Sequence, residues 1–165
     1  MQCGLVEKCH RKNSIVSKNC MNVHHIGIDM NIVLDTNCLI MAISARNRYY
    51  QIWHAFLEGR YVLCLTNSII EEYSEVISRN ISPLISEMIL TVILNRKNVL
   101  RLDPSFEFGL IKEDPDDNKF VDCAIAGNAK FIVTQDHHFN ILKQIDFPKV
   151  EVITIQQFLS VIDNI

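Results

Sequence analysis

The stretch "MNIVLDTNCLI", residues 30–40, places a short run of branched apolar residues directly before Asp35. A second apolar run begins after Asn37. A short continuous apolar run bounded by turn-forming residues is typical of a strand that is buried on both faces of a parallel sheet. We therefore predict a strand at residues 31–35 that carries the Asp35 carboxylate at its carboxyl end.

Short apolar strands alternate with amphipathic helices along the rest of the chain. Further strands are predicted at residues 61–65, 99–102, 131–134 and 150–153. Helices are predicted at residues 38–44, 49–58, 68–79, 83–96, 118–129, 139–145 and 155–162. This alternation predicts the α/β class, as a three-layer α/β/α sandwich around a central, mostly parallel sheet. Ligands of such sheets bind outside the carboxyl ends of the strands, where Asp35 and Asp136 are expected.

The chain of 165 residues suits one domain with a tail, because 48% of its residues are hydrophobic and 21% are charged. Residues 1–29 are polar and lack sustained periodicity, so we predict a poorly ordered N-terminal extension there. The compact domain is expected at residues 30–165, with Met30 as a natural start. The cysteines of the extension lack the C-x₂₋₄-C spacing of zinc sites, so we expect free thiols.

The sequence also bears on the compartment. No apolar run reaches the roughly 18 residues that a membrane helix needs, and the N-terminal stretch has no secretory signal. Cys38, Cys64 and Cys123 lie in apolar segments, which is typical of small core residues in a reducing compartment. We expect a cytoplasmic protein without a membrane partner.

The net charge of −3 conceals an uneven distribution. Positions 1–30 hold four basic and two acidic residues, which leaves 12 basic and 17 acidic residues, a balance of −5, for residues 31–165. An acidic domain does not attract nucleic acid by bulk charge. If this domain acts on phosphates, cations must mediate.

The acids of the helix predicted at residues 68–79 can be sorted by the direction in which they point. With about 100° per residue, Glu71 and Glu75 point roughly 160° away from the centre of the apolar stripe. Glu72 points roughly 100° away, at the edge of the stripe. Glu72 is therefore the acid that can face a cleft, and a solvated helix residue is the alternative.

The same geometry separates the acids of "DPDDNKFVDCAIAGNAK", residues 114–130. Asp117 falls inside the apolar arc, whereas Asp116 and Asp122 fall roughly 110° and 130° away from it. A carboxylate at the head of the buried stripe faces the edge of the sheet. The alternative role for Asp117 is that of a helix N-cap, since aspartate is a good cap and the helix dipole favours it.

Two strand-end acids and two helix acids can converge at the carboxyl edge of one sheet. Taken alone, Asp35 and Asp136 are also compatible with turns. Together with Glu72 and Asp117 they would repel one another unless a cation neutralises them. An all-oxygen cluster suits Mg²⁺ or Mn²⁺ better than zinc. Such a site would screen a phosphodiester from the acidic domain and activate a water, so the pattern predicts metal-dependent phosphoryl hydrolysis.

The segments "MNIVLDTNCLI", "NSIIEEYSEVISR" and "DPDDNKFVDCAIAGNAKFIVTQD" resemble the PIN-domain ribonuclease family over nearly all of residues 30–160. The last segment is the most specific, and it is similar to the branch that contains toxins of toxin–antitoxin pairs. The resemblance implies a Mg²⁺- or Mn²⁺-dependent endoribonuclease. It assigns metal binding and catalysis to four acids, which by motif are Asp35, Glu72, Asp117 and Asp136.

The resemblance also implies partners and supporting residues. The partners are RNA, a cognate antitoxin protein and, as in many members of the family, a second copy of the chain. Asn37 and Thr134 match positions that orient the carboxylates or a substrate phosphate. Many relatives carry another acid where this chain has His138. We expect an exposed loop histidine there, and the alternative is a neutral imidazole that contacts phosphate or ligates metal. This difference leaves one-metal and two-metal sites open, and RNA and DNA also both remain open as substrates.

Other classes fit the sequence less well. Haloacid-dehalogenase phosphatases need a second aspartate at the position of Asn37, and a receiver domain fits the "DPDDNKF" and "TQD" segments poorly. The five glycines never cluster, which excludes phosphate loops and dinucleotide fingerprints. The remaining alternative is a non-catalytic PIN-like module that binds nucleic acid or protein.

Overall fold

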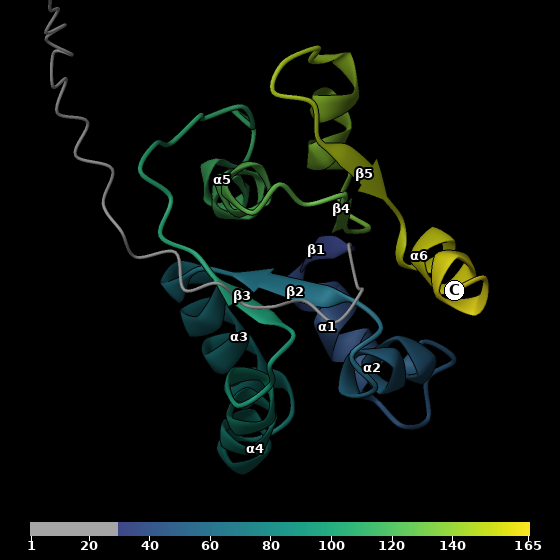
Figure 1. Cartoon of the computed structure of the whole chain (residues 1–165). Helices are drawn as coiled ribbons and strands as arrows, with labels where there is room; N and C mark the ends of the chain where they lie inside the picture. Colours follow the sequence, from purple (N-terminus) through teal and green to yellow (C-terminus); the bar gives the residue numbers. More distant parts are fainter. Residues whose placement is uncertain (1–29) are drawn as a thin grey trace, which may run out of the picture.

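The computed structural model describes residues 30–165, in which a five-stranded sheet is covered by helices on both faces (Figure 1). The strands run parallel in the order β3-β2-β1-β4-β5. Their bounds are β1 (Asn31–Leu34), β2 (Val62–Leu65), β3 (Val99–Arg101), β4 (Phe131–Val133) and β5 (Glu151–Ile153). The predicted three-layer α/β/α sandwich is confirmed. The predicted N-terminal extension, residues 1–29, lies outside the described residues.

The helices form two layers (Figure 1). Their bounds are α1 (Thr36–Ile43), α2 (Tyr50–Leu57), α3 (Asn67–Asn80), α4 (Pro83–Leu94), α5 (Asn118–Ala126) and α6 (Ile155–Asp163), with 3₁₀ segments η1 (Pro115–Asp117) and η2 (His137–Gln144). α5 and η2 lie on the face of the sheet opposite α1 to α4, and α6 packs against α2 (Figure 1). Within residues 30–165, no helix is both long and apolar enough to cross a membrane.

The helix boundaries differ from the prediction by one or two residues in most cases, and two helices differ in a way that affects the site. The helix expected at residues 139–145 is the 3₁₀ segment η2 and begins earlier, because the Asp136 side chain accepts the N–H of His138 and caps it. The helix expected at residues 118–129 ends at Ala126. Asn128 there has a φ of 45°, which reverses the chain direction before β4.

The centre of the sheet is the core of the domain. All four residues of β2 are buried, and three of the four residues of β1 are buried. Each fully buried branched side chain contributes about 1.5–3 kcal/mol relative to an exposed one. The buried Tyr73 hydroxyl donates to the carbonyl of Leu34 and so fixes α3 against the end of β1. The helix that carries Glu72 is thereby held at the carboxyl edge of the sheet.

The strand order reverses between β1 and β4. β1 pairs with β2 on one side and with β4 on the other, and Leu34 is in register with Val133. The N–H of Asp35 continues this ladder with a 3.0 Å hydrogen bond to the carbonyl of Val133. The loops that follow the two strands therefore diverge from one point at the sheet edge, which is where doubly wound folds bind ligands.

Candidate functional site

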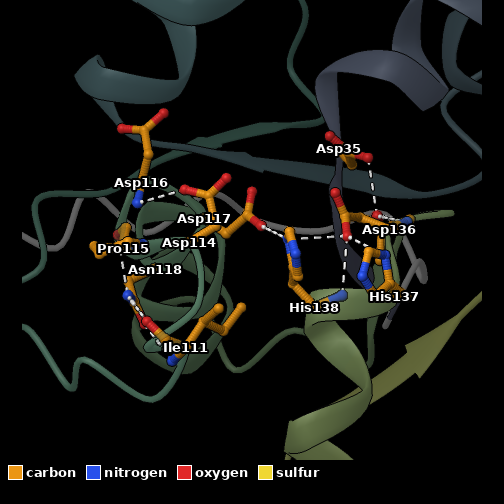
Figure 2. Close-up of polar contacts among 11 residues, drawn as sticks. Asp35, Ile111, Asp114, Pro115, Asp116, Asp117, Asn118, Asp136, His137 and His138 are labelled. Atoms are coloured by element: carbon orange, nitrogen blue, oxygen red, sulfur yellow. Dashed lines mark hydrogen bonds and ion pairs between the residues drawn. The ribbon is translucent and has the colours of Figure 1, made fainter.

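The two strand-end aspartates meet at this reversal point. Asp35 is 7% exposed, and its Oδ2 accepts a hydrogen bond of 2.9 Å from the Thr134 hydroxyl. The same hydroxyl accepts the N–H of Asp136 at 2.9 Å. Asp35 and Asp136 lie next to each other in Figure 2. The structure thus brings together two of the predicted acids, with Thr134 between them.

Glu72 approaches the pair from α3. Its Oε1 accepts a 2.5 Å hydrogen bond from the Thr36 hydroxyl, and its Oε2 lies 2.6 Å from the Lys119 ammonium. Burial raises the pKa of Asp35, and the negative charges of Glu72 and Asp136 raise it further. Glu72 is therefore close enough to act on Asp35 electrostatically. Its neighbours Glu71 and Glu75 are exposed, as their direction on the helix predicts.

Asp117 approaches from the opposite face of the sheet, at the end of η1. It precedes α5 but makes no side-chain capping bond, so capping does not explain its position. Burial, together with the charges of Asp114, Asp136 and Asp35, raises the pKa of Asp117 to about 6. The four predicted acids are thus linked by their mutual charges.

Asp114 belongs to the same cluster, although the sequence analysis did not single it out. One ligand atom each of Asp114, Asp117 and His138 lies within 4.8 Å of the others. The sequence signal was the spacing of three residues between the two aspartates, which places them on one side of a helical turn. The sequence pattern predicts no helical segment before residue 118, so it does not define the direction in which Asp114 points.

The prediction of an exposed loop histidine at position 138 was wrong. The His138 side chain is only 24% exposed, and its Nδ1 lies 3.2 Å from Asp136 Oδ1 and 3.6 Å from Asp117 Oδ2. Figure 2 shows the His138 ring between the two carboxylates. The Asp136 cap on η2 turns the side chain inward, because it fixes the backbone at residue 138.

Lys119 is a second residue that the sequence analysis missed. Its ammonium group contacts both Glu72 and Asp116. Burial lowers the pKa of Lys119, but the bonds to Asp116 and Glu72 outweigh this effect and raise the pKa above its ordinary value. The site therefore contains an internal cation that occupies one oxygen of Glu72.

Two other residues lie differently from what their sequence positions suggested. The Asn37 side chain is exposed, and it is the Asn37 backbone that stabilises the charged form of Asp35 by hydrogen bonding. Asp122 lies off the apolar stripe but is buried, because its carboxylate accepts the N–H of Phe108 from the loop that covers it. Asp122 is thus a structural carboxylate outside the cluster.

The donor atoms of the cluster fit a divalent cation. Among the described residues, the buried side-chain atoms without a hydrogen-bond partner are Glu72 Oε2, Asp117 Oδ2 and His138 Nδ1, and the last two face each other. Several carboxylates at this separation need a neutralising charge, and oxygen donors with one imidazole suit a hard or borderline metal ion. Within residues 30–165, neither Asp35 nor Glu72 belongs to a group of three or more ligand atoms that all lie within 4.8 Å of one another. Any role of these two as ligands needs water bridges or a small side-chain movement.

The chain has recognisable relatives. A family model described as PIN domain matches residues 31–138. The fold is similar to that of VapBC2 from Rickettsia felis bound to a DNA fragment from their promoter (19% identity, TM-score 0.54, 76% of this chain and 98% of that chain). It is also similar to DNA-bound VapBC from Salmonella typhimurium (17% identity, TM-score 0.54, 76% of this chain and 98% of that chain). A third similar structure is VapBC-1 from nontypeable Haemophilus influenzae (16% identity, TM-score 0.52, 77% of this chain and 99% of that chain). No match is found among curated proteins.

Proposed function

The chain belongs to the PIN domain family, and we propose that it is a divalent-cation-dependent endoribonuclease that acts as the toxin of a toxin–antitoxin pair. Family membership supports a nuclease in general. RNA as substrate, Mg²⁺ or Mn²⁺ as cofactor and the toxin role are the finer parts of the proposal. The observation that carries it is the convergence of Asp35, Asp117 and Asp136, whose charges act on one another at the reversal point of the sheet.

Each residue has a defined task in this proposal. Asp117 and Asp136 hold the cation, and Asp35 joins them through a water or after a small side-chain movement. Thr134 orients Asp35 through its hydroxyl. Glu72, which Thr36 and Lys119 hold in place, completes the site or positions a water. When bound, a divalent cation neutralises the carboxylates and polarises both the water and the phosphodiester.

A cleft beside the cluster provides room for the substrate. It has a volume of about 650 Å³, and its walls include Leu110, Lys112, His137, His138 and Ile141. His138 thus borders both the cleft and the carboxylates, so a strand in the cleft would pass next to the cation. The apolar side chains and the two imidazole rings of these walls suit an unpaired base, which supports single-stranded RNA.

The partner proposal follows from the acidic character of the site. A small antitoxin protein could insert an arginine or a lysine among the carboxylates and so replace the cation. The fold that this chain shares with the VapBC structures supports such a partner. We also propose that the protein acts in the cytoplasm, where the buried thiols of Cys38, Cys64 and Cys123 stay reduced.

The test is a cleavage assay on single-stranded RNA with Mn²⁺, using the wild type, Asp35→Asn and Asp117→Asn. We expect both substitutions to reduce cleavage by at least about a hundredfold, because they remove charged ligands from the site. Asp163→Asn, an exposed carboxylate on α6, is the matched control and should cleave like the wild type.

The outcomes separate the alternatives. Equal cleavage by the wild type and both site variants would expose a contaminating nuclease and refute the enzyme proposal. Binding of RNA without cleavage, in the presence of Mn²⁺ or Mg²⁺, would favour the non-catalytic PIN-like module. A parallel series on single-stranded DNA of the same sequence decides which nucleic acid is the substrate.

A further inference from the structure

We infer that His138 is a nitrogen ligand of the cation site, which it completes together with the carboxylates of Asp117 and Asp136. This inference deepens the proposed function and rests on it. It predicts a mixed nitrogen and oxygen site in place of an all-carboxylate one. Asp114 lies close enough to take part directly or through a water.

The spacing of the donor atoms carries the inference. His138 Nδ1 lies 3.2 Å from Asp136 Oδ1 and 3.6 Å from Asp117 Oδ2. Ligand atoms at adjacent corners of an octahedron lie about 3 Å apart when metal–ligand distances are near 2.1 Å. The two separations from His138 are slightly wider than this. Asp117 and Asp136 share no group of ligand atoms within 4.8 Å of one another, so their carboxylates would have to move toward each other to hold one ion together with His138.

The protein leaves the nitrogen available for this role. His138 Nδ1 is buried and makes no hydrogen bond within residues 30–165; it faces the carboxylates of Asp136 and Asp117, with which it pairs only when the imidazole is protonated. The Asp136 cap fixes the backbone at His138, while the His137 ring packs beside the imidazole with its centroid 4.3 Å away. These contacts orient the ring before any ion arrives, so little conformational freedom is lost on binding.

An imidazole ligand has a consequence for metal choice. Mg²⁺ prefers oxygen ligands, whereas Mn²⁺ and later transition ions accept imidazole nitrogen. A site with His138 as a ligand therefore favours Mn²⁺ over Mg²⁺ more strongly than the same site with a carboxylate at position 138.

The test is pulsed electron paramagnetic resonance of Mn²⁺ added to the full chain without a histidine tag. We expect nitrogen modulation from a coordinated imidazole in the wild type. The modulation should disappear in His138→Asp while Mn²⁺ still binds, because a carboxylate replaces the imidazole. The matched control is His54→Gln, which changes an exposed histidine on α2 away from the cluster and should keep the modulation. Titration calorimetry should show that His138→Asp reduces the preference for Mn²⁺ over Mg²⁺ by about tenfold.

Each contrary result has a distinct meaning. Mn²⁺ bound to the wild type without nitrogen modulation would overturn the role of His138 and leave the cation site of the proposed function intact. Modulation that persists in His138→Asp would assign the nitrogen to another histidine and would also overturn the inference. A wild type that binds no Mn²⁺ would refute both the inference and the cation dependence of the proposed nuclease.

Discussion

The hydroxyl of Thr134 connects the two strand-end carboxylates, because it accepts the N–H of Asp136 and donates to Asp35 Oδ2, both at 2.9 Å. Thr134 is itself buried and follows β4 directly. A hydroxyl can donate one hydrogen bond and accept others, so this single group satisfies both neighbours. Thr134 therefore links the two carboxylates directly, in addition to the backbone ladder that pairs β1 with β4.

The substitution Thr134→Val keeps the shape of the side chain and removes this link. The Thr134 bond lowers the pKa of Asp35, so its loss makes the charged carboxylate harder to maintain. We expect Mn²⁺ affinity to fall about tenfold in titration calorimetry, as for other residues that orient metal ligands. We also expect about 1–2 kcal/mol of lost stability, because the buried N–H of Asp136 loses its acceptor.

The control for this prediction is Thr134→Ser, which retains the hydroxyl and loses only a methyl group. It should bind Mn²⁺ nearly as well as the wild type. If the valine and serine variants have the same affinity, the hydroxyl does not orient Asp35, and the loss must come from packing.

Substitution of Lys119 is expected to have the opposite effect, a gain in Mn²⁺ affinity. Its ammonium group lies 2.6 Å from Glu72 Oε2, so it places a positive charge at the edge of the acidic cluster. In Lys119→Met this charge is removed, and we expect Mn²⁺ to bind on the order of threefold to tenfold more tightly. The metal-free protein should become less stable, since Glu72 then repels Asp35 without a neutralising partner.

The matched control for Lys119→Met is Lys143→Met, which removes one positive charge from an exposed position of η2. Its Mn²⁺ affinity in titration calorimetry should equal that of the wild type. Equal gains in both variants would show that the overall charge of the protein, and not the contact with Glu72, sets the affinity.

The sequence was sufficient for the parts of the fold that follow from local pattern. Continuous apolar runs located the five strands, and their alternation with helices predicted that the strands run parallel. The angular position of each side chain around the helix distinguished Glu72 from Glu71 and Glu75, because α3 is regular over its whole length. Regular periodicity is the common element in these successes.

The residues that the sequence analysis missed lie where periodicity fails. Asp114 and His138 follow no α-helical stripe, since Asp114 caps the 3₁₀ segment η1 and His138 lies at the start of the 3₁₀ segment η2. Lys119 lies on a regular helix, but its partner Glu72 is on another helix 47 positions earlier, and helical direction does not reveal such a pairing. Contacts between elements therefore needed the structure.

Asn118 holds the loop that carries Asp114 and Asp117. Its Oδ1 accepts the N–H of Ile111 at 2.9 Å, and its Nδ2 donates to the carbonyls of Ile111 at 2.7 Å and Pro115 at 3.0 Å (Figure 2). The side chain is buried, so Asn118→Ala leaves these backbone groups without partners. We expect a loss of about 2–4 kcal/mol in urea unfolding.

A surface asparagine is the comparison for Asn118→Ala. Asn140 is exposed and accepts one bond from Lys143, so Asn140→Ala should change stability by no more than about 0.5 kcal/mol. A loss in Asn118→Ala as small as in Asn140→Ala would mean that the loop holds its position without the asparagine.

Asp117 makes the stability of the metal-free protein depend on pH. Burial and the charges of Asp114, Asp136 and Asp35 raise its pKa from 3.8 to about 6 in the folded state. Between these two values the folded protein binds more protons at this site than the unfolded chain does. The contribution of Asp117 to stability is therefore fully present below pH 3.8 and is lost as the pH rises through about 6.

Asp117→Asn removes this dependence, so in the presence of EDTA the variant should be more stable than the wild type at pH 7. Calorimetric melting at pH 4, 5, 6 and 7 should show that the difference in melting temperature between the variant and the wild type shrinks as the pH falls. We expect this difference to be about a few degrees at most, because the carboxylate is partly exposed to solvent. Saturating Mn²⁺ should reverse the order, since the wild type gains more from binding than the variant. A variant that melts below the wild type at pH 7 in EDTA would show that the Asp117 carboxylate is not strained by its neighbours.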